Sequence, residues 1–467
     1  MGGNNKMMQN DEKAYGASMM KIKSIFDADT FVELGAYTKR FGSAEDFEGV
    51  VCGYGAINGK LAFAFAQDSS RTKGAFGERQ AKKIIETYAL AVKNGAPVIG
   101  VFDSAGTVIY DGAGALAAYG RLMKAVSDAS GIVPQIAVID GVCGGSSAVI
   151  ASMFDFVITI KDSSKLYVNS PFVIGEKVGS AEYAASAGIS ACAADNAESA
   201  FGIVRDLVCL LPSNNSEEAY VETADILGRS VTADPTAYSS EALVCELADN
   251  GSFIRLYEKY TENTIFGLAS FGGVVAGVVA SNKDKKGILD IRSARAAAKL
   301  VSFCDAFGLP VLTLVDSEGL DVSGEAEENA YAGELAKLAY AYTSSENAKV
   351  TVVLGKAYGA GFTLLGSKAL GADMAYAIPE SCISVLSPEA SVAFVWNSKV
   401  GVDGKTRAEL ETEWKQKCAS AAEAADAGEI DDIIEMSELR KRICSALQML
   451  SAKACGKPSR RHANMPL

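Results

Sequence analysis

The two halves of the chain repeat one another, and this duplication limits the possible folds more than any other feature of the sequence. Three pairs of segments match in the same order, at offsets of 213 or 214 positions. We infer tandem copies of one domain of about 215–230 residues, because a fixed period is the signature of a repeated unit. The pairs are Val98–Gly106 with Val311–Gly319, Gln135–Gly141 with Lys349–Gly355, and Gly53–Gly59 with Gly267–Gly273.

Each copy alternates strands with helices. Glu78–Asn94 carries apolar residues at helical spacing and is followed by Gly95 and Pro97, which end helices. Pro97–Phe102 is apolar without alternation, which is typical of a strand buried on both faces. The pattern predicts an α/β fold with mostly parallel sheets. Further predicted elements are the apolar meander Val50–Gln67, the helices Ala113–Ser127, Ala294–Phe307 and Ala326–Tyr342, the strands Gln135–Ile139, Val311–Val315 and Val350–Leu354, and an Ala-rich helical stretch Ala181–Ala200.

A polar segment, Pro212–Glu217, lies between the copies. It places the domain boundary somewhere within residues 212–240, and we predict domains at 1–225 and 226–467. The 467 residues are enough for two to four domains of about 100–200 residues.

The charges and the histidine count exclude several classes of protein. Lys and Arg total 44 against 57 Asp and Glu, for a net charge of −13 without a basic stripe, which argues against a nucleic-acid binder. The single histidine, His462, makes Ser-His-Asp hydrolysis and His-rich metal chemistry improbable. The ten cysteines are scattered and form no CxxC motif, which predicts reduced thiols rather than a disulfide framework.

The sequence predicts a cytoplasmic protein. Its first residues, Met1–Lys6, are polar and have no apolar stretch typical of a signal peptide. The longest near-apolar run, Ile265–Ala280, is interrupted by Ser270 and is shorter than the ~20 residues that span a bilayer.

Small residues follow the central strand of each copy. Gly141–Ala148 reads as a tight turn that opens a helix, where a ligand oxygen can reach backbone N–H groups. Paired donors of this kind stabilise an enolate or a tetrahedral oxyanion, at about 3 kcal/mol per donor. Ala357–Gly361 offers a second copy. The alternative is that small residues only let helix and strand pack closely. A Gly145→Pro variant, which removes one N–H, would test the donor role.

An aspartate also ends a strand in each copy, within Asp103–Gly106 and Asp316–Gly319. Asp103 and Asp316 either orient their loops through side-chain hydrogen bonds or act on substrate, and we favour the loop role. A local basic cluster either meets substrate phosphates or forms a solvated helix face, which is the commoner case, and Arg460 and Arg461 are open to the same two interpretations. The cluster consists of Lys73, Arg79, Lys82 and Lys83. We expect His462 to pack within the tail or contact solvent rather than to act as a catalyst.

The chain resembles the carboxyltransferase subunits of biotin-dependent acyl-CoA carboxylases and decarboxylases, of the propionyl-CoA carboxylase β and methylmalonyl-CoA decarboxylase α type. The resemblance covers nearly the whole chain, and its closing motif is specific. The segments that carry it are Ile25–Leu34, Gly49–Gly55, Lys73–Glu78, Leu211–Asn215, Phe303–Phe307, Lys356–Gly359 and Arg461–Leu467.

The resemblance implies a tandem duplication of a crotonase-like (ClpP/crotonase) domain, with active sites where the N-domain of one subunit faces the C-domain of another. It implies that Gly145 and Ser146 hold the oxygen of the acyl-CoA thioester enolate, and that Ala360 and Gly361 hold the ureido oxygen of biotin. In this mechanism biotin takes the α-proton, so no protein base is needed. The residues expected to line the two ligand sites are Gly144, Gly359, Phe76 and Gly77.

The implied substrate is a short-chain acyl-CoA of the propionyl or methylmalonyl type. Biotin is expected on a separate biotin carboxyl carrier protein, because the chain contains no Ala-Met-Lys-Met site. Further partners are a biotin carboxylase or a membrane decarboxylase subunit, and the expected assembly is a homodimer or a trimer of dimers.

The chain departs from the family pattern at several positions. The usual Asp-Ser-Gly-Gly-Ala-Arg reads Asp103–Val108, with Ala105, Thr107 and Val108 as the changed positions. The usual Pro-Gly-Phe turn reads Glu318–Leu320 and is followed by the acidic residues Glu325, Glu327 and Glu328. Ser146 replaces a glycine but keeps its backbone N–H, and Thr363 stands where a substrate-sorting Asp is common. These departures leave the acyl group open and allow an altered or diminished activity.

Three alternatives remain at this point. The chain could be the α subunit of a sodium-pumping decarboxylase, which runs the transfer from acyl-CoA to biotin. It could be another crotonase-fold enzyme, such as a hydratase, a hydrolase or a biotin-independent decarboxylase, for which a carboxylate in the N-domain site would be the evidence. It could also be a non-catalytic scaffold, which would not bind CoA thioesters.

Overall fold

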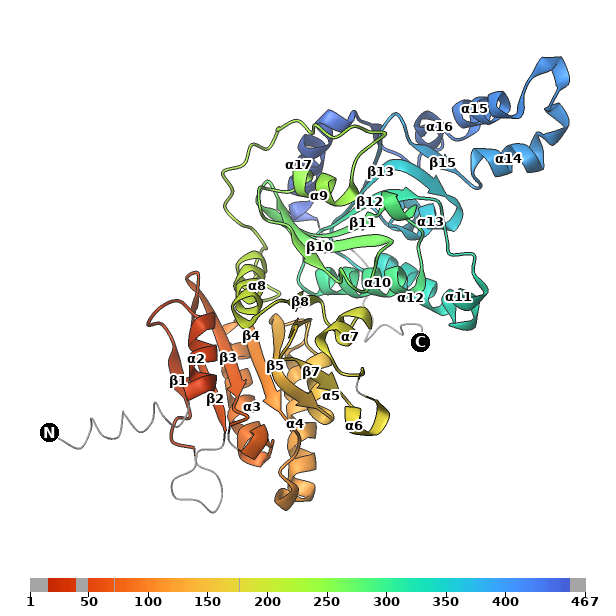
Figure 1. The fold of residues 1–467 in the computed structure, drawn as a ribbon. Coiled ribbons are helices and arrows are strands. Elements are labelled where there is room, and N and C mark those ends of the chain that lie inside the picture. Colours follow the sequence, from red (N-terminus) through yellow and green to blue (C-terminus); the bar gives the residue numbers. More distant parts are fainter. Residues whose placement is uncertain (1–15, 39–48, 71, 176, 454–467) are drawn as a thin grey trace. The chain divides into compact units, whose positions relative to one another are not determined.

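The computed structural model of the chain describes residues 16–38, 49–70, 72–175 and 177–453. The chain divides into two compact units, Met1–Glu218 (unit 1) and Ala219–Leu467 (unit 2), and each is described by itself (Figure 1). The tail with Arg460, Arg461 and His462 lies outside the described residues. The domain limits 1–225 and 226–467 stay a prediction.

Unit 1 is built on one sheet with the strand order β1-β2-β3-β4-β5-β6-β8, and β7 pairs with the far end of β5. The first two pairings are antiparallel and all the others are parallel. The strands are β1 (Val32–Leu34), β2 (Val50–Ile57), β3 (Lys60–Gln67), β4 (Val98–Ser104), β5 (Gln135–Gly144), β6 (Phe156–Ile160), β7 (Lys165–Tyr167) and β8 (Cys192–Ala194).

Unit 2 repeats this sheet strand for strand, in the order β9-β10-β11-β12-β13-β14-β16 with β15 paired to β13. The same two pairings are antiparallel and the others parallel. The predicted α/β duplication is therefore confirmed. The strands are β9 (Ile254–Leu256), β10 (Thr264–Phe271), β11 (Val274–Ser281), β12 (Val311–Ser317), β13 (Lys349–Tyr358), β14 (Met374–Ala377), β15 (Cys382–Ser384) and β16 (Asp432–Ile433).

The predicted meander is a β-hairpin, β2–β3, and unit 2 has its counterpart in β10–β11. Two-residue turns join the strands, Asn58-Gly59 in unit 1 and Gly272-Gly273 in unit 2, and all four residues have positive φ. Such turns require left-handed backbone at both positions, which Asn and Gly adopt most readily. The turn chemistry thus fixes the register of both hairpins.

Helices complete each unit around its own buried apolar core. The pair α3 and α4 packs together in unit 1, as α10 and α12 do in unit 2, and Figure 1 shows α14 and α15 extending away from the unit 2 sheet. The helices of unit 1 are α2 (Gly16–Ile25), α3 (Glu78–Asn94), α4 (Ala113–Ala129), α5 (Ser146–Ser152), α6 (Pro171–Ile174), α7 (Ala181–Ser186) and α8 (Ala197–Leu210). Those of unit 2 are α9 (Ser240–Leu247), α10 (Ile291–Ala306), α11 (Gly324–Glu328), α12 (Tyr331–Ser344), α13 (Gly359–Leu364), α14 (Pro388–Val395), α15 (Arg407–Cys418), α16 (Ala421–Asp426) and α17 (Leu439–Met449).

Two predicted helices are interrupted. The Ala-rich stretch 181–200 contains α7, then Gly188 with a φ of 75°, then strand β8 before α8 begins. The helix predicted over 326–342 breaks between α11 and α12, where Ala330 has a φ of 60°. In both cases a left-handed residue ends the helical hydrogen-bond ladder, which alanine content alone does not reveal.

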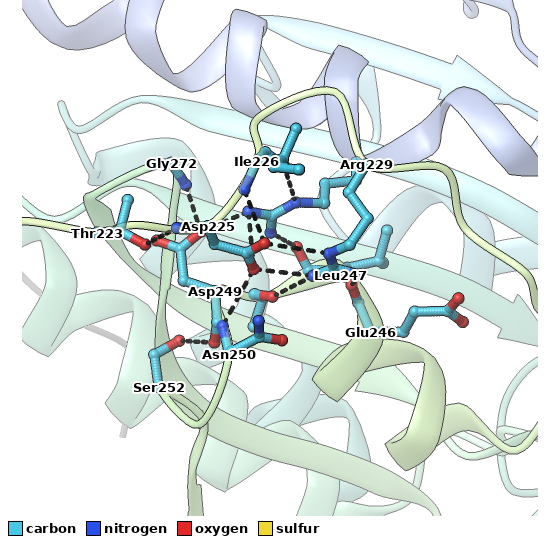
Figure 2. A network of polar contacts seen from close by, with 12 residues as sticks. Thr223, Asp225, Ile226, Arg229, Glu246, Leu247, Asp249, Asn250, Ser252 and Gly272 are labelled. Carbon is cyan, nitrogen blue, oxygen red and sulfur yellow. Dashed lines mark hydrogen bonds and ion pairs between the residues drawn. The ribbon is translucent and has the colours of Figure 1, made fainter.

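A buried network of charges ties residues 219–232, which we call the strap, to the rest of unit 2 (Figure 2). Arg440 of α17 pairs with Asp249 at 2.6 Å and with Asp225 of the strap at 3.3 Å. Arg229 of the strap also binds Asp225, at 3.0 Å, and Val221 adds a backbone bond to Gly273. The strap is therefore part of unit 2.

None of the helices in the described ranges is long and apolar enough to cross a membrane. The nine cysteines within these ranges are all free, and five of them are buried.

Candidate functional site

The same irregularity occurs at the end of the central strands in both units. The register between β4 and β5 shifts between Phe102 and Ser104, and that between β12 and β13 shifts between Val315 and Ser317. An aspartate sits in each shift, Asp103 in unit 1 and Asp316 in unit 2. A bulge of this kind re-aims the end of a strand.

Each aspartate side chain occupies the space of a missing side chain on the next strand. A Cβ at Gly141 would lie 2.0 Å from Asp103 Oδ1, and one at Gly355 would lie 2.5 Å from Asp316 Oδ1. The same oxygens accept the next backbone N–H groups, from Val142 at 3.2 Å and from Lys356 at 2.9 Å. These contacts confirm the loop role predicted for both aspartates.

The bulge in unit 1 leads directly to Gly145 and Ser146. Gly145 caps α5 with a φ of 60° and a ψ of −127°, and no atom lies within 4 Å of the place where its Cβ would be. Both residues are half-buried. The turn therefore needs glycine for its backbone conformation, and the space beside it is open to a ligand.

The two predicted donors in unit 1 differ. The Gly145 N–H donates to the Tyr167 carbonyl at 2.9 Å, so it is engaged within the unit. Ser146 is the first residue of α5, and the first N–H groups of a helix have no acceptor within the helix. The planned Gly145→Pro test is unsuitable, because proline requires a φ near −65° and the residue has +60°.

In unit 2 the equivalent turn is Gly359 and Ala360, one residue earlier than the predicted pair Ala360 and Gly361. The sheet pairs Gly144 with Tyr167 and Tyr358 with Ser384, so Gly359, with a φ of 55°, is the counterpart of Gly145. Gly361 is buried, and a Cβ there would lie 2.9 Å from Gly319 Cα. Gly361 thus has a packing role in the described chain.

The other predicted ligand-lining residues of unit 1 lie in packed positions. Gly144 is buried under the Tyr167 ring, 3.0 Å from the place of its missing Cβ. The Phe76 side chain is 1% exposed, with its ring 4.5 Å from that of Tyr119. Gly77 is buried and leaves room for Asp111. Sequence spacing located these loops, but it did not distinguish residues buried by packing from residues that a ligand can reach.

The sequence analysis did not single out Gly106, whose backbone lies open in the structure. Gly106 follows the bulge with a φ of 147°, and open space surrounds the place of its missing Cβ. Its carbonyl accepts the Phe76 N–H at 2.8 Å, while among the described residues no acceptor is recorded for its own N–H. The repeated Asp-Ser-x-Gly pattern at 103–106 and 316–319 was the available signal.

Unit 2 contains a pocket of about 850 Å³ beside its turn. Gly359, Ala360 and Thr363 form one side of it, and Val385 and Trp414 another. The Trp414 Nε1–H is buried without a hydrogen-bond partner among the described residues. Because this nitrogen has no exposed surface, it is not open to a ligand in the pocket, and the Trp414 ring packs edge-on against Trp396 at 4.8 Å.

The loop after β12 carries a group of three charges. Glu318 lies 2.7 Å from Lys356 and 3.5 Å from Lys286. The hydrogen bond to Lys356 holds the pKa of Glu318 below its usual range, and Glu318 raises the pKa of Lys356 in turn. Burial raises the pKa of the neighbouring Tyr358, so its phenol stays protonated. The charge of Glu318, the first residue of the turn Glu318–Leu320, is thus balanced by two lysines.

The basic cluster of unit 1 is not one surface. Lys83 is buried, donates to the Val50 carbonyl at 2.8 Å and lies 3.6 Å from Glu33. Lys82 is exposed and faces Glu86 at 3.9 Å. Lys73 is exposed, and its carbonyl accepts the Ala105 N–H at 3.0 Å. Only Lys73 of these three contacts the loop after β4.

The family model of the carboxyl transferase domain matches residues 12–465. The chain belongs to this family. The carboxyl transferase fold found here in two copies is the duplicated crotonase-like fold expected from the sequence, and the chain is an enzyme of the carboxyltransferase type. The site residues sit where the two copies of that fold end their central strands.

Similar proteins cover nearly the whole chain. A methylmalonyl-CoA decarboxylase subunit alpha of Veillonella parvula is 32% identical over all of this chain and 96% of its own length. A putative propionyl-CoA carboxylase beta chain of Bacillus subtilis is 34% identical with the same coverage. A structure of the transcarboxylase 12S hexamer with methylmalonyl-coenzyme A and methylmalonic acid bound is 29% identical, with a TM-score of 0.91 over 98% of this chain and 95% of that one.

Proposed function

We propose that this carboxyltransferase moves a carboxyl group between biotin on a separate carrier protein and the α-carbon of a short-chain acyl-CoA. The observation that carries the proposal is the pair of equivalent turns, Gly145-Ser146 and Gly359-Ala360, at the ends of duplicated central strands. The solved relative that holds methylmalonyl-coenzyme A supports the substrate class.

Unit 1 is the proposed acyl-CoA half. The Ser146 N–H and the Gly106 N–H are its candidate donors for the thioester oxygen, whose negative charge grows as the α-proton leaves. Donors already fixed in place stabilise that charge without having to reorganise. No histidine lies in the described ranges, so removal of the proton does not depend on an imidazole from these parts of the chain.

Unit 2 is the proposed biotin half, and its residues fit that group. The pocket lining is largely apolar, and the Ala360 backbone N–H, in the first turn of α13, is a donor suited to a ureido oxygen. When bound, carboxylated biotin would supply the carboxyl group and a nitrogen that accepts a proton. Ala360 would then hold and orient the ureido group, and the apolar walls, which include Trp414, would exclude water.

We also propose that unit 1 of one subunit faces unit 2 of another. Large apolar side chains are exposed in both units, including Tyr110 and Phe172 in unit 1 and Val322 and Phe394 in unit 2. Exposed apolar patches of this kind mark protein interfaces. The hexamer assembly of transcarboxylase 12S supports an oligomer of this chain.

The purified chain is mixed with methylmalonyl-CoA or malonyl-CoA and free biotin, and loss of the acyl-CoA is followed by mass spectrometry. Loss that requires biotin supports the proposal and identifies the acyl group. Loss without biotin favours a biotin-independent crotonase-fold decarboxylase. No loss in either condition, with CoA thioesters failing to bind, favours the scaffold.

The same assay addresses direction, because the decarboxylase relative is about as similar as the carboxylase relatives. If transfer from acyl-CoA to biotin is faster than transfer from carboxybiotin to acyl-CoA, the result favours the decarboxylase α subunit. Copurification with a biotin carboxylase, rather than with a membrane subunit, favours the carboxylase.

The donor assignment is tested with Ser146→Pro. Proline is favoured at the first position of a helix, so this variant removes the N–H while the fold stays intact. We expect kcat to fall about 100-fold or more, since one such donor contributes about 3 kcal/mol. Ser146→Ala keeps the N–H and serves as the matched control. Equal kcat for the two variants would exclude the Ser146 N–H as a donor.

The shared site is tested by coexpressing Ser146→Pro chains with Ala360→Pro chains. If each site combines the two units of different subunits, mixed dimers keep one intact site, and random mixing restores about a quarter of wild-type activity. Sites formed within one chain would give no restoration.

A further inference from the structure

We propose that Tyr238 and Ser69 are positioning residues. The hydroxyl group of each holds the aspartate that fixes the donor turn of its own unit. Tyr238 acts in unit 2 through Asp316, and Ser69 acts in unit 1 through Asp103. The inference rests on the proposed function and assigns to it two residues that touch no substrate.

In unit 2, Asp316 links Tyr238 to the turn. The Tyr238 hydroxyl donates to Asp316 Oδ2 at 2.7 Å, while Asp316 Oδ1 accepts the Lys356 N–H at 2.9 Å. Lys356 precedes the turn residue Gly359 by three positions on the same strand end. The Asp316 carboxylate thus joins the segment before α9 to the strand end that carries the biotin-side donor.

Tyr238 is itself held firmly in place. It is 6% exposed, and Lys283 Nζ lies 4.1 Å from its ring centre and donates to the Thr236 carbonyl at 2.8 Å. A buried hydrogen bond to a carboxylate is stronger than a bond between neutral groups. Loss of this hydroxyl frees the Asp316 side chain to rotate, and the backbone of Lys356 loses its fixed acceptor.

In unit 1 the equivalent carboxylate is held differently. Ser69 Oγ donates to Asp103 Oδ2 at 2.6 Å, and Lys21 Nζ lies 3.7 Å from the same oxygen. Asp103 Oδ1 accepts the Val142 N–H, three positions before Gly145. Ser69 is exposed, so water can replace its hydrogen bond in part. Removal of the serine hydroxyl should therefore cost less than removal of the tyrosine hydroxyl.

Two reactions of the proposed enzyme distinguish the effect of the Tyr238 hydroxyl from that of the Ser69 hydroxyl. Loss of CO₂ from N-carboxybiotin without acyl-CoA uses only unit 2: the C–N bond breaks, its electron pair stays on nitrogen, and the nitrogen takes a proton from water. Complete transfer to acyl-CoA uses both units. A change confined to unit 1 alters the second reaction and leaves the first unchanged.

The experiment compares Tyr238→Phe and Ser69→Ala in the full chain, measuring kcat and KM for both reactions at equal folded concentration. Tyr238→Phe should lower kcat about tenfold in both reactions, as expected for a group that orients a donor. Ser69→Ala should lower kcat several-fold in complete transfer and leave CO₂ loss from N-carboxybiotin within twofold of the wild type.

Matched controls exclude a general loss of stability. Tyr342→Phe removes another buried hydroxyl of unit 2, which bonds Thr313 at 2.9 Å and not Asp316, and it should leave kcat unchanged. Ser69→Thr keeps a hydroxyl and should restore transfer. Equal effects of Tyr238→Phe and Tyr342→Phe would overturn the inference, as would a Ser69→Ala variant that slows both reactions equally. A wild-type chain that carries out neither reaction would overturn the proposed function and this inference with it.

Discussion

The two units contain the same clasp between an aspartate, an arginine and a hairpin turn, but at very different depths. In unit 1, Asp27 accepts the N–H groups of the turn residues Asn58 and Gly59, and Arg205 of α8 binds Asp27 and the Ile25 carbonyl. In unit 2, Asp249 accepts from Gly272 and Gly273, and Arg440 of α17 binds Asp249 and the Leu247 carbonyl. Each carbonyl lies two positions before its aspartate.

The strap makes the difference between them. The Arg205 side chain is 29% exposed, whereas that of Arg440 is fully buried and donates to the Ile226 carbonyl of the strap at 3.2 Å. The strap brings Asp225, which gives Arg440 a second carboxylate. The comparison teaches that a hydrogen-bond pattern can be copied intact while its energetic importance changes, because solvent screens one copy and not the other.

The largest effect is expected for Arg440→Met. This change leaves the Asp249 carboxylate buried without its cation, while Asp225 keeps Arg229, and removal of one partner from a buried ion pair costs about 3–5 kcal/mol. The free energy of unfolding of the full chain, followed by urea titration, should fall by that amount. A loss below about 1 kcal/mol would show that the buried clasp is no stronger than a surface pair.

A smaller effect is expected for Gly272→Asn, which gives the unit 2 turn the residue of unit 1. A Cβ at Gly272 would lie 2.3 Å from Leu227 Cδ2 of the strap, whereas Asn58 has room and accepts from Arg205 at 2.8 Å. Crowding of this kind costs about 1–3 kcal/mol. The turn itself tolerates Asn, so the loss should disappear in a Gly272→Asn, Leu227→Ala double variant, measured by the same titration.

The sequence predicted the parts of the fold that depend on local pattern. The duplication, α3 and the buried strands followed from offsets, helical spacing and apolar runs. The clasps could not be predicted, because Asp27 and Arg205 are 178 positions apart and meet only through the sheet order. The strap was hidden for the same reason, as the sequence placed residues 219–232 only within the boundary interval 212–240.

The sequence predicted which loops form the candidate site, but not which backbone N–H groups in them are free. The small residues at 141–148 and 357–361 marked both turns. Their hydrogen bonds decide which N–H is free, and the bond from Gly145 to Tyr167 depends on the pairing of β7 with β5. Composition cannot distinguish a glycine that leaves space for a ligand from Gly361, whose missing side chain leaves space for the Gly319 backbone.

Acid should weaken the buried clasp over a defined range. The hydrogen bond from Arg229 lowers the pKa of Asp225 to about 2, against about 3.9 in an unfolded chain. A lowered folded pKa contributes stability above the unfolded value, and that stability is lost as the pH falls from about 4 to about 2. In urea titrations across this range, Asp225→Asn should show a shallower loss than the wild type. Parallel losses would show that Asp225 is not part of the acid response.

The smallest effect is expected for Arg205→Met, the counterpart of the first variant. The hydrogen bond from the Gly59 N–H contributes most to lowering the pKa of Asp27, ahead of the Arg205 side chain, so the half-buried aspartate keeps its turn contacts when the arginine is removed. Water then solvates both Asp27 and the Ile25 carbonyl, and the loss should stay within about 1 kcal/mol. A loss in urea titration that equals that of Arg440→Met would show that the arginine supports the hairpin by packing rather than by charge. In that case burial would not determine how much each clasp contributes to stability, and the strap would have a role other than shielding Arg440.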